Sequence, residues 1–446
     1  MAVRRFALVV WIALGLSSIT APPAEIRRPN RILAPPMNSF TKTLPNFATT
    51  KTATMITIEP VAFDQSPPLR DAASLMPAVQ RIQRGRQDKT DPAQRPTSKL
   101  DPALQTVNRP NLMPPTTVFA GQSAADLTSV IGFAYVPPDP TGAIGINHYV
   151  QWVNTIISVY QRNGTRVYGP VTGNTLWNGF NNQCATTNNG DPIVLYDRIA
   201  DRWLMSQFSF RFSGGQPVAP FYQCIAVSQT GDPTGSYYRY AYEFAKFPDY
   251  GKFGIWHDGY YMALNLYDGD TPSGVGIAAF DRAAMLTGDS NARMIFSDMF
   301  SVDPTLSTML PSDWNGFIPP PRNAPNYFVQ FNDDAWRYPS DQLEMWAFHV
   351  DWNTISNSTF SNVGVLNTAP FDSNLCNYGL CINQPSTTQK LDAIADRLMY
   401  RLQYRNFGDY QSLVLNHSVD ANGADQAGIR WYELRCSHSC ASIADW

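Results

Sequence analysis

The chain has 446 residues, of which only 15 % are charged and 13 % are aromatic. An average soluble domain has roughly 25 % charged residues, so this composition favours a β-rich extracellular protein over a helical cytosolic one. The formal net charge of −3 provides no overall basic field to hold nucleic acid or an anionic membrane, so no nucleic-acid partner is expected.

Residues 1–23 have the pattern of a secretory signal peptide. Arg4 and Arg5 precede an apolar run from Phe6 to Leu16, and small residues follow. The run is too short for a comfortable membrane span, so we expect none after signal cleavage; an uncleaved anchor is the alternative. The protein is therefore expected to be secreted, periplasmic or located at the cell surface.

Residues 24–117 are rich in Pro, Thr, Ser, Gln and Arg and have no sustained helical or strand period. A segment of this composition cannot bury enough apolar surface to offset the entropy of its chain. We therefore expect a disordered, Pro-rich stalk or linker over this range.

The residue pattern changes in residues 118–435, where short apolar or aromatic runs are separated by Gly, Asn, Asp and Pro. This pattern is typical of an all-β domain. The runs form about five repeated groups of four consecutive antiparallel strands, which is the repeat of a β-propeller blade. We expect an all-β β-propeller whose groups begin at DPTGAIGIN, IVLYD, PDYGKFGIWHD, PSDWNGF and QKLDAIAD.

Aspartates frame the short turns inside these groups. In YDRIADRW, Asp197 and Asp201 lie on either side of a turn between two strands, and LDAIADRL and WHDGYY have a similar pattern. An Asp at the start of a turn accepts hydrogen bonds from nearby backbone N–H groups. We expect these aspartates to shape the turn between the first and second strands of a blade.

A second set of aspartates comes just before each candidate innermost strand. In a propeller the repetition would gather them at the mouth of the central channel, where ligands usually bind. Gathered carboxylates favour Ca²⁺, a cationic ligand or a raised pKa on one member; capping of a turn is the competing interpretation. The predicted ligand-binding residues are Asp139, Asp191, Asp249, Asp313 and Asp392, with Asp191 and Asp249 as the Ca²⁺ ligands.

Two of these carboxylates could serve a glycoside hydrolase as acid and as base or nucleophile. The propeller region has few glutamates and lacks the motifs of sialidases, esterases, zinc proteases and phosphate-binding loops. The leading hypothesis is a binding or surface-interaction module for an extracellular glycan or protein. A glycoside hydrolase is the alternative, and no catalytic residue is assigned.

Six cysteines in an exported chain are expected to pair. We expect Cys184 to bond Cys224 and Cys376 to bond Cys381. Cys436 and Cys440 could form a bridge or, with His438, suggest a metal site, but two thiols and one His do not complete a four-ligand zinc site.

Several motifs together resemble a family of exported bacterial proteins of unassigned activity, similar to broadly sialidase-like, BNR-like propellers. The resemblance spans residues 132–435 and implies export and a propeller, not a reaction. Members of this kind continue beyond the segment similar to AGIRWYELR, whereas this chain runs into CSHSCASIADW, so a truncated end with an irregular tail over 436–446 is expected. The motifs are PPDPTGAIGINHYVQWVN, GDPIVLYDRIADRWLMSQF, CIAVSQTGDPTGSYYRY, FPDYGKFGIWHDGYYM and LDAIADRLMYRLQYRNFG.

Overall fold

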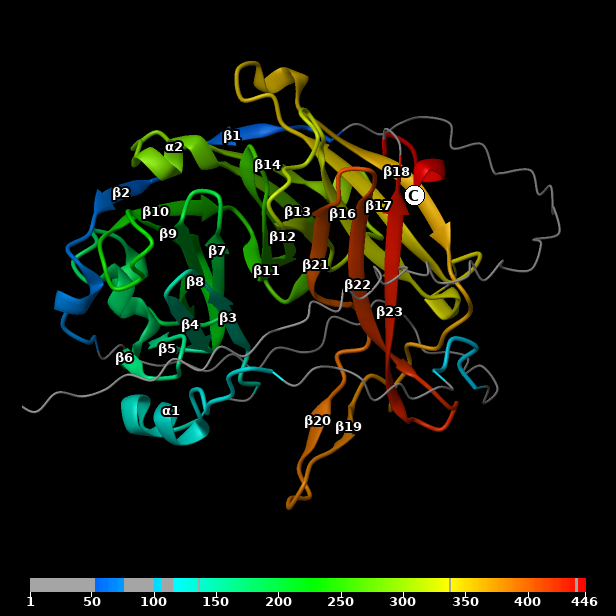
Figure 1. Ribbon diagram of the computed structural model, residues 1–446, viewed down its shortest axis with the longest axis horizontal. Helices are drawn as coiled ribbons and strands as arrows, with labels where there is room; N and C mark the ends of the chain where they lie inside the picture. Colours follow the sequence, from blue (N-terminus) through cyan, green and yellow to red (C-terminus); the bar gives the residue numbers. More distant parts are fainter. Residues whose placement is uncertain (1–52, 76–99, 106–114, 135–136, 337, 438–439) are drawn as a thin grey trace, which may run out of the picture. The chain divides into compact units, whose positions relative to one another are not determined.

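Antiparallel strands dominate the part of the chain that the structure, a computed structural model, describes: residues 53–75, 100–105, 115–134, 137–336, 338–437 and 440–446. The predicted signal peptide lies outside these residues. The strands form five consecutive groups in which each strand pairs with the next along the chain. The all-β propeller prediction is confirmed, and Figure 1 shows the arrangement of the strands.

Blade 1 is a four-stranded sheet in which the strands follow one another in order. Val150 and Trp152 of its second strand are buried, and so are all residues of its third strand from Ile156 to Tyr160. Gly164 has a φ of 92° in the turn between the last two strands, a conformation that glycine adopts without strain. The strands are β3 (Pro140–Ile144), β4 (His148–Val153), β5 (Ile156–Gln161) and β6 (Arg166–Thr172).

Blades 2 and 3 each have four consecutive strands and a fifth strand added at the outer edge from an earlier part of the chain. Blade 2 contains β7 (Ile193–Asp197), β8 (Arg202–Ser213), β9 (Gln216–Ser228) and β10 (Tyr237–Phe244), with β2 (Ala62–Gln65) beside β10. Blade 3 contains β11 (Phe247–Ile255), β12 (Gly259–Asp268), β13 (Thr271–Asp281) and β14 (Met294–Asp298), with β1 (Ile56–Ile58) beside β14.

Blades 4 and 5 share one seven-stranded sheet, because their first strands pair in parallel. Blade 4 contains β15 (Leu310–Asn315), β16 (Asn326–Asn332), β17 (Gln342–His349) and β18 (Thr359–Asn367). Blade 5 has three strands in this sheet, β21 (Leu398–Asn406), β22 (Gln411–Asp420) and β23 (Ala427–Cys436). The prediction of four strands in every blade is therefore wrong for blade 5.

The first strands of successive blades lie next to one another. The backbone N–H of Val194 in β7 donates to Oγ1 of Thr141 in β3 over 3.2 Å. The N–H of Ile255 in β11 donates to Oδ1 of Asp313 in β15 over 3.0 Å. Together with the parallel pair β15 and β21, these bonds make β3, β7, β11, β15 and β21 the inner strands of the five blades.

One side chain joins the last inner strand to the first. Arg401 of β21 donates from Nη2 to the backbone oxygen of Gly142 in β3 over 3.1 Å, and from Nη1 to Oδ2 of Asp313 in β15 over 3.2 Å. Tyr400, the preceding residue, donates its hydroxyl to the oxygen of Phe253 in β11. Blade 5 is thus connected to blades 1, 3 and 4 at the centre.

Aromatic side chains fill the spaces between blades. Tyr242 of β10 and Phe280 of β13 meet with ring centres 5.0 Å apart, and both are fully buried. Trp256, which directly follows β11 of blade 3, and Tyr404 of blade 5 meet with ring centres 4.6 Å apart. Aromatic side chains of neighbouring blades therefore pack against one another between the sheets.

The prediction that residues 24–117 are disordered is wrong for residues 53–75 and 100–105. These residues include β1 and β2, and Leu69 is 2 % exposed in the core beside blade 1. Asp64 of β2 accepts two bonds from Arg239, and Asp101 accepts a bond from the buried Arg430 of β23. Figure 1 shows β1 and β2 in blue at the outer edge of the blades.

The segment QKLDAIAD does not form the inner strand of blade 5, contrary to prediction. Its strand β20 (Lys390–Asp392) pairs with β19 (Leu380–Asn383) in a separate two-stranded sheet, which projects from the blades in Figure 1. The following segment, Leu398–Asn406, takes the inner position. Its residues Leu398, Leu402 and Tyr404 are an even number of residues apart, so they lie on one face of the strand, and all three are buried.

The disulfides Cys184–Cys224 and Cys376–Cys381 form as predicted. Cys436 and Cys440 are also bonded to each other, so their thiols are not available as metal ligands, and His438 lies outside the described residues. In residues 437 and 440–446, the described part of the tail after β23, there is no strand; this part packs on blade 4, where the rings of Trp446 and Tyr327 meet at 5.1 Å. None of the helices in the described residues is long and apolar enough to cross a bilayer.

Candidate functional site

Three of the predicted acidic residues meet at the start of the inner strands of blades 1, 2 and 3. Asp139 directly precedes β3, Asp191 is two residues before β7, and Asp249 lies near the start of β11. The negative charges of Asp191 and Asp249 both act on the carboxyl group of Asp139. We call these three residues the acidic triad.

The backbone at the triad is held in an unusual conformation. Asp139 and Asp191 have φ angles of 41° and 45°, although a proline follows each of them and normally favours extended backbone before it. In blade 3 the positive φ falls one residue later, on Tyr250 at 56°. Left-handed backbone outside glycine costs free energy and is concentrated at functional sites, so the repetition in three blades marks this region.

A β-bulge positions the blade 3 member. Asp249 pairs with Asn265 and Lys252 pairs with Ala263, so β11 has one more residue than β12 between these pairs. A bulge of this kind turns a side chain away from the regular alternation. It allows Asp249 and Lys252 both to act on Asp139, one through a negative and the other through a positive charge.

The carboxyl group of Asp139 has a pKa raised to about 7. Burial is the main cause, because the charged form loses its hydration, and the charge of Asp191 is the next cause. Lys252 and a hydrogen bond of 3.0 Å from Nδ2 of Asn154 act in the opposite direction. Near neutral pH this group therefore exchanges a proton readily, as a general acid or base must.

Cations and an aromatic ring lie beside the triad. The ammonium of Lys252 is 3.9 Å from the ring centre of Tyr250, and the guanidinium of Arg397 is 4.8 Å from the same centre. Arg397 is itself held by two bonds to Asp396, of 2.8 and 2.6 Å. The site thus combines three carboxylates with two cations and the ring of Tyr250.

Asp313 does not join the triad, contrary to prediction. It is 3 % exposed and accepts the N–H of Ile255, the last residue of β11, whereas Asp249 lies near the first residue of that strand. Its other partner is Arg401, and burial raises its pKa. Asp313 lies further along the channel, where it holds blades 3, 4 and 5 together.

Asp392 is also outside the triad, because its strand β20 belongs to the separate hairpin instead of the inner ring. Its Oδ1 accepts the N–H of Ile394 over 2.9 Å. The sequence pattern was misleading here because an Asp that shapes a local turn and an Asp that precedes an inner strand have similar neighbours.

Asp197 does accept the turn hydrogen bond that the sequence predicts, from the N–H of Ala200 over 3.1 Å. It also accepts bonds of 2.6 and 3.0 Å from Nε and Nη2 of Arg282, which directly follows β13 of blade 3, and a bond from the hydroxyl of Tyr260. Asp197 is 1 % exposed. The side chain therefore joins blade 2 to blade 3 in addition to shaping its turn.

Ca²⁺ binding by Asp191 and Asp249 stays a prediction. Among the described residues, the carboxylates close enough to share one ion are those of Asp333, Asp334 and Asp341, away from the triad. Backbone N–H groups already bond Asp333 and Asp341. The triad carboxylates are more widely spaced than that group, which favours an opening between them over a closed oxygen cage.

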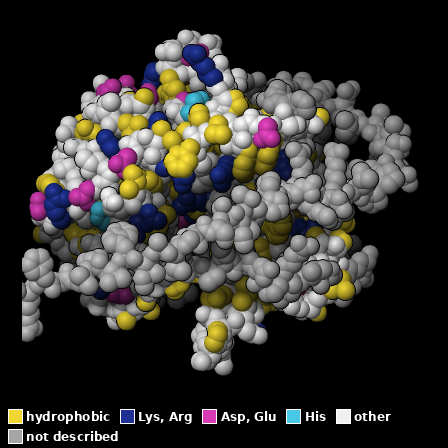
Figure 2. All heavy atoms as spheres, viewed as in Figure 1, with side chains coloured by type: hydrophobic (Ala, Val, Ile, Leu, Met, Phe, Trp, Pro, Cys, Tyr) yellow, Lys and Arg dark blue, Asp and Glu magenta, His cyan; other side chains and the backbone are white. Residues whose placement is uncertain are grey.

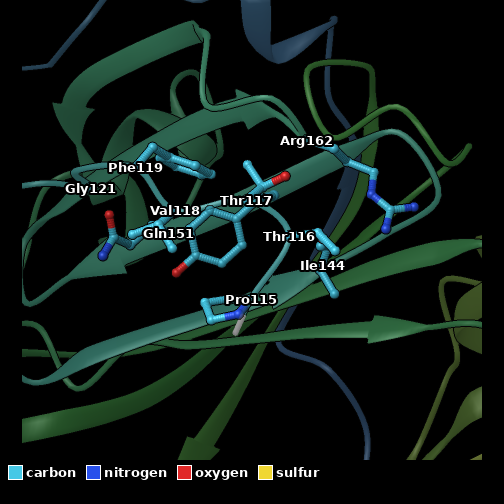
Figure 3. A pocket seen from close by; sticks show the side chains of 10 residues that line it. Pro115, Thr116, Thr117, Val118, Phe119, Gly121, Ile144, Gln151 and Arg162 are labelled. Atoms are coloured by element: carbon cyan, nitrogen blue, oxygen red, sulfur yellow. The ribbon is translucent and has the colours of Figure 1, made fainter. Parts of the chain in front are cut away.

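A separate cavity of about 600 Å³ lies on blade 1. Phe119 and Gln151 are at one end of it, and Ile144 and Arg162 are at the other (Figure 3). Ile144 is the last residue of β3, so this cavity is near the end of the strand opposite to Asp139.

Four neighbours of the predicted aspartates were not predicted from the sequence: Asn154, Lys252, Arg397 and Arg401. Lys252 was the easiest to find, because it follows Asp249 by three residues in FPDYGKFG and the glycine between them suggests a bulge. The others come from other blades or from a loop, so no local pattern relates them to the triad.

No family model matches the chain, and no curated protein matches it. The resemblance to exported bacterial propellers therefore stays a prediction beyond the fold itself. Solved structures with local similarity include a β-1,3-galactosidase of glycoside hydrolase family 43, with 10 % identity, a TM-score of 0.29, and 66 % of this chain aligned to 55 % of that one.

Two further structures are an exo-β-1,3-galactanase from Phanerochaete chrysosporium, solved with galactose, and an α-L-arabinofuranosidase from Lactobacillus brevis. The first has 12 % identity and a TM-score of 0.25 over 52 % of this chain and 61 % of its own. The second has 11 % identity and a TM-score of 0.29 over 66 % and 89 %. The chain thus spans little more than half of the first two structures, and similarity at this level assigns it no activity.

Proposed function

We propose that the chain is a carbohydrate-active hydrolase whose acid and base groups belong to the acidic triad. The observation that carries the proposal is the pKa of about 7 on Asp139 beside two further carboxylates. Hydrolysis of a glycosidic bond uses two carboxyl groups in different protonation states on either side of that bond. Unequal environments for neighbouring carboxyl groups are how proteins produce this difference.

Asp139 is assigned the role of acid. Its carboxyl proton passes to the glycosidic oxygen as the bond between that oxygen and the anomeric carbon breaks. Asp191 is the stronger electrostatic neighbour of Asp139 and keeps the proton on it. Asp249, the weaker neighbour, takes a proton from a water molecule whose oxygen bonds the anomeric carbon. The products are two sugars with free hydroxyl groups, so one water is consumed and the protons balance.

Tyr250 and the cations beside it are assigned to substrate binding. An aromatic ring offers an apolar face for the C–H groups of a sugar ring, and Lys252 and Arg397 provide hydrogen-bond donors for hydroxyl groups. Lys252 also limits the mutual repulsion of the three carboxylates, which is a reason for its place in the site.

The test is hydrolysis of a panel of nitrophenyl glycosides, arabinan and β-1,3-galactan by the full chain. Asp139→Asn and Asp249→Asn should each lower kcat at least 100-fold. A matched control is Asp268→Asn with Asp270→Asn in the exposed hairpin between β12 and β13, which should keep full activity.

Release of sugar that is equal in the wild type and in Asp139→Asn would refute the assignment. Binding of these glycans without any turnover, abolished by the same substitutions, would instead make the triad the site of a binding module, the leading hypothesis from the sequence.

A further inference from the structure

Exposed hydrophobic side chains lie on the turns between the first and second strands of four of the five blades. Blade 1 has Ile146 at 61 % exposure and blade 2 has Ile199 at 50 %. Blade 4 has Phe317 at 81 % and Ile318 at 46 %, and blade 5 has Phe407 at 41 %. Only blade 3 lacks such a residue among these turns in the described chain.

These turns lie on one face of the propeller, opposite to the acidic triad. The triad precedes the inner strands, whereas each of these turns follows an inner strand. Inner strands that start at a common point, as β3, β7 and β11 do, also end on a common side, and β15 and β21 run parallel. We call the five turns and their exposed side chains the turn face.

Contacts between blades show that the turn face is continuous. Arg198 of blade 2 lies over the ring of Phe317 of blade 4, with its guanidinium carbon 5.5 Å from the ring centre. Ile318 lies beside Gly408 of blade 5, and Nδ2 of Asn406 donates to the oxygen of Pro319 over 2.7 Å. Side chains from separate blades thus form one surface.

Blade 1 joins this surface through blade 2. Gly145, which precedes Ile146, lies against the rings of Trp203 and Tyr196 of blade 2. Ile144, 58 % exposed, extends the apolar surface into the cavity of Figure 3.

Arginines lie between the apolar side chains. The exposed Arg405 lies over the ring of Phe407 at 4.8 Å, and the exposed Arg162 donates to the oxygen of Ile146 over 3.3 Å. With Arg198, Arg322 and the half-buried Arg202, five arginines lie on or next to these turns, against three acids, Asp201, Asp258 and Asp409.

Asp201 is in addition bonded by the hydroxyl of Tyr196 over 2.5 Å. The turn face is therefore locally positive on a chain whose net charge is −3. Figure 2 shows hydrophobic side chains in yellow next to basic side chains in dark blue on the viewed face.

We propose that the turn face docks on an anionic lipid surface, with Phe317 and Ile318 entering the bilayer interface and Arg198 and Arg405 binding headgroup phosphates. Large exposed apolar side chains on a polar surface mark an interaction site. Apolar groups that enter the interface beside cations that meet anionic lipid are the two elements of peripheral membrane binding.

A lipid surface fits better than a second copy of the chain. An isologous dimer would place the same face against itself and so bring two surfaces rich in arginine together, which repel one another. The apolar side chains are also on the tips of separate turns, a form that suits a soft bilayer. This docking is a surface association and requires no membrane-spanning segment.

The experiment is cosedimentation of the full chain with vesicles of phosphatidylcholine, with and without 50 mol % phosphatidylglycerol. The wild type should bind the anionic vesicles and lose binding as salt is raised. Phe317→Ser with Ile318→Ser should weaken binding at least about tenfold. Arg198→Gln and Arg405→Gln should each weaken it roughly fivefold.

The matched control is Ile429→Ser with Trp431→Ser. These residues are 67 % and 66 % exposed on β23, outside the turn face, and their loss should leave vesicle binding unchanged. Ile146→Ser offers a second test on another blade if the blade 4 variant does not fold.

Equal binding to neutral and anionic vesicles, or no binding to either, would overturn the proposal. So would a concentration-dependent dimer in sedimentation equilibrium that Phe317→Ser with Ile318→Ser abolishes, because it would assign the face to self-association. Loss of glycan hydrolysis has no bearing on these outcomes, since the triad lies at the other end of the inner strands.

Discussion

Asp197 and Arg282 provide a quantitative test of how the blades are joined. The Asp197 side chain is 1 % exposed and that of Arg282 is 13 % exposed, and two hydrogen bonds of 2.6 and 3.0 Å connect them. Removing one partner of a buried pair typically costs about 3–5 kcal/mol, because the remaining charge has no compensating partner. Asn at position 197 keeps one acceptor oxygen, so we expect Asp197→Asn to cost about 3 kcal/mol, at the lower end of that range.

The assay is equilibrium unfolding in urea of Asp197→Asn, Arg282→Met and the double variant. Each single variant leaves one charged group buried, whereas the double variant leaves none. The double variant should therefore cost less than the sum of the two, with a coupling free energy of about 2 kcal/mol or more. Single costs below about 1 kcal/mol that add without coupling would refute the view that this pair joins blades 2 and 3.

Three further predictions concern the rest of the propeller. Cys184→Ser should reduce the free energy of unfolding by about 4 kcal/mol and Cys376→Ser by about 2 kcal/mol, because the disulfides close loops with sequence separations of 40 and 5. Urea unfolding of the two variants measures these costs, and equal costs would contradict the prediction. His417 is buried, and burial lowers its pKa to about 3, so the unfolded chain takes up this proton first as the pH falls below 6.5. The stability of the wild type relative to His417→Gln should therefore fall by about 1.4 kcal/mol per pH unit between about pH 6 and 4. A stability difference that stays constant over this range would refute the prediction. If Asp191 and Asp249 bind Ca²⁺, the melting temperature should be higher in Ca²⁺ than in chelator, and Asp191→Asn with Asp249→Asn should abolish the difference. Equal melting temperatures of the wild type in the two buffers would rule this cation out.

The strand groups could be predicted because each blade repeats the same local pattern of four short runs and polar turns. The starts of the first four groups correspond to the inner strands β3, β7, β11 and β15. The fifth start failed because QKLDAIAD has the right composition, but Lys390–Asp392 is exposed throughout and pairs only in a hairpin. Composition alone cannot distinguish an exposed hairpin from a buried inner strand when the apolar run is this short.

The edge strands β1 and β2 could not be predicted for a different reason. They have three and four residues, and none of these residues is fully buried. Their attachment depends on backbone hydrogen bonds to β14 and β10, which any sequence can make, and on Asp64 meeting Arg239 from a distant part of the chain. Low apolar content therefore suggested a stalk where the chain instead extends two blades.

The candidate site was predictable where it follows the repeat. Asp139, Asp191 and Asp249 come together because equivalent positions in successive blades converge at the axis. Asp313 does not lie with these three residues, because it is three residues after the start of its inner strand, β15. Its carboxylate instead accepts hydrogen bonds from the N–H of Ile255 and from Arg401.

The proposal depends most on Asp139 holding a proton near neutral pH, because it is buried and because Asp191 and Asp249 add their negative charges beside it. Carbon-13 NMR titration of Asp-labelled full chain, with Asp139→Asn to assign the resonance, measures this directly. The pKa of Asp139 should be about 7 in the wild type and should fall in Asp191→Asn. An Asp139 resonance that titrates near the ordinary value of about 4, and does not respond to Asp191→Asn, would contradict the account.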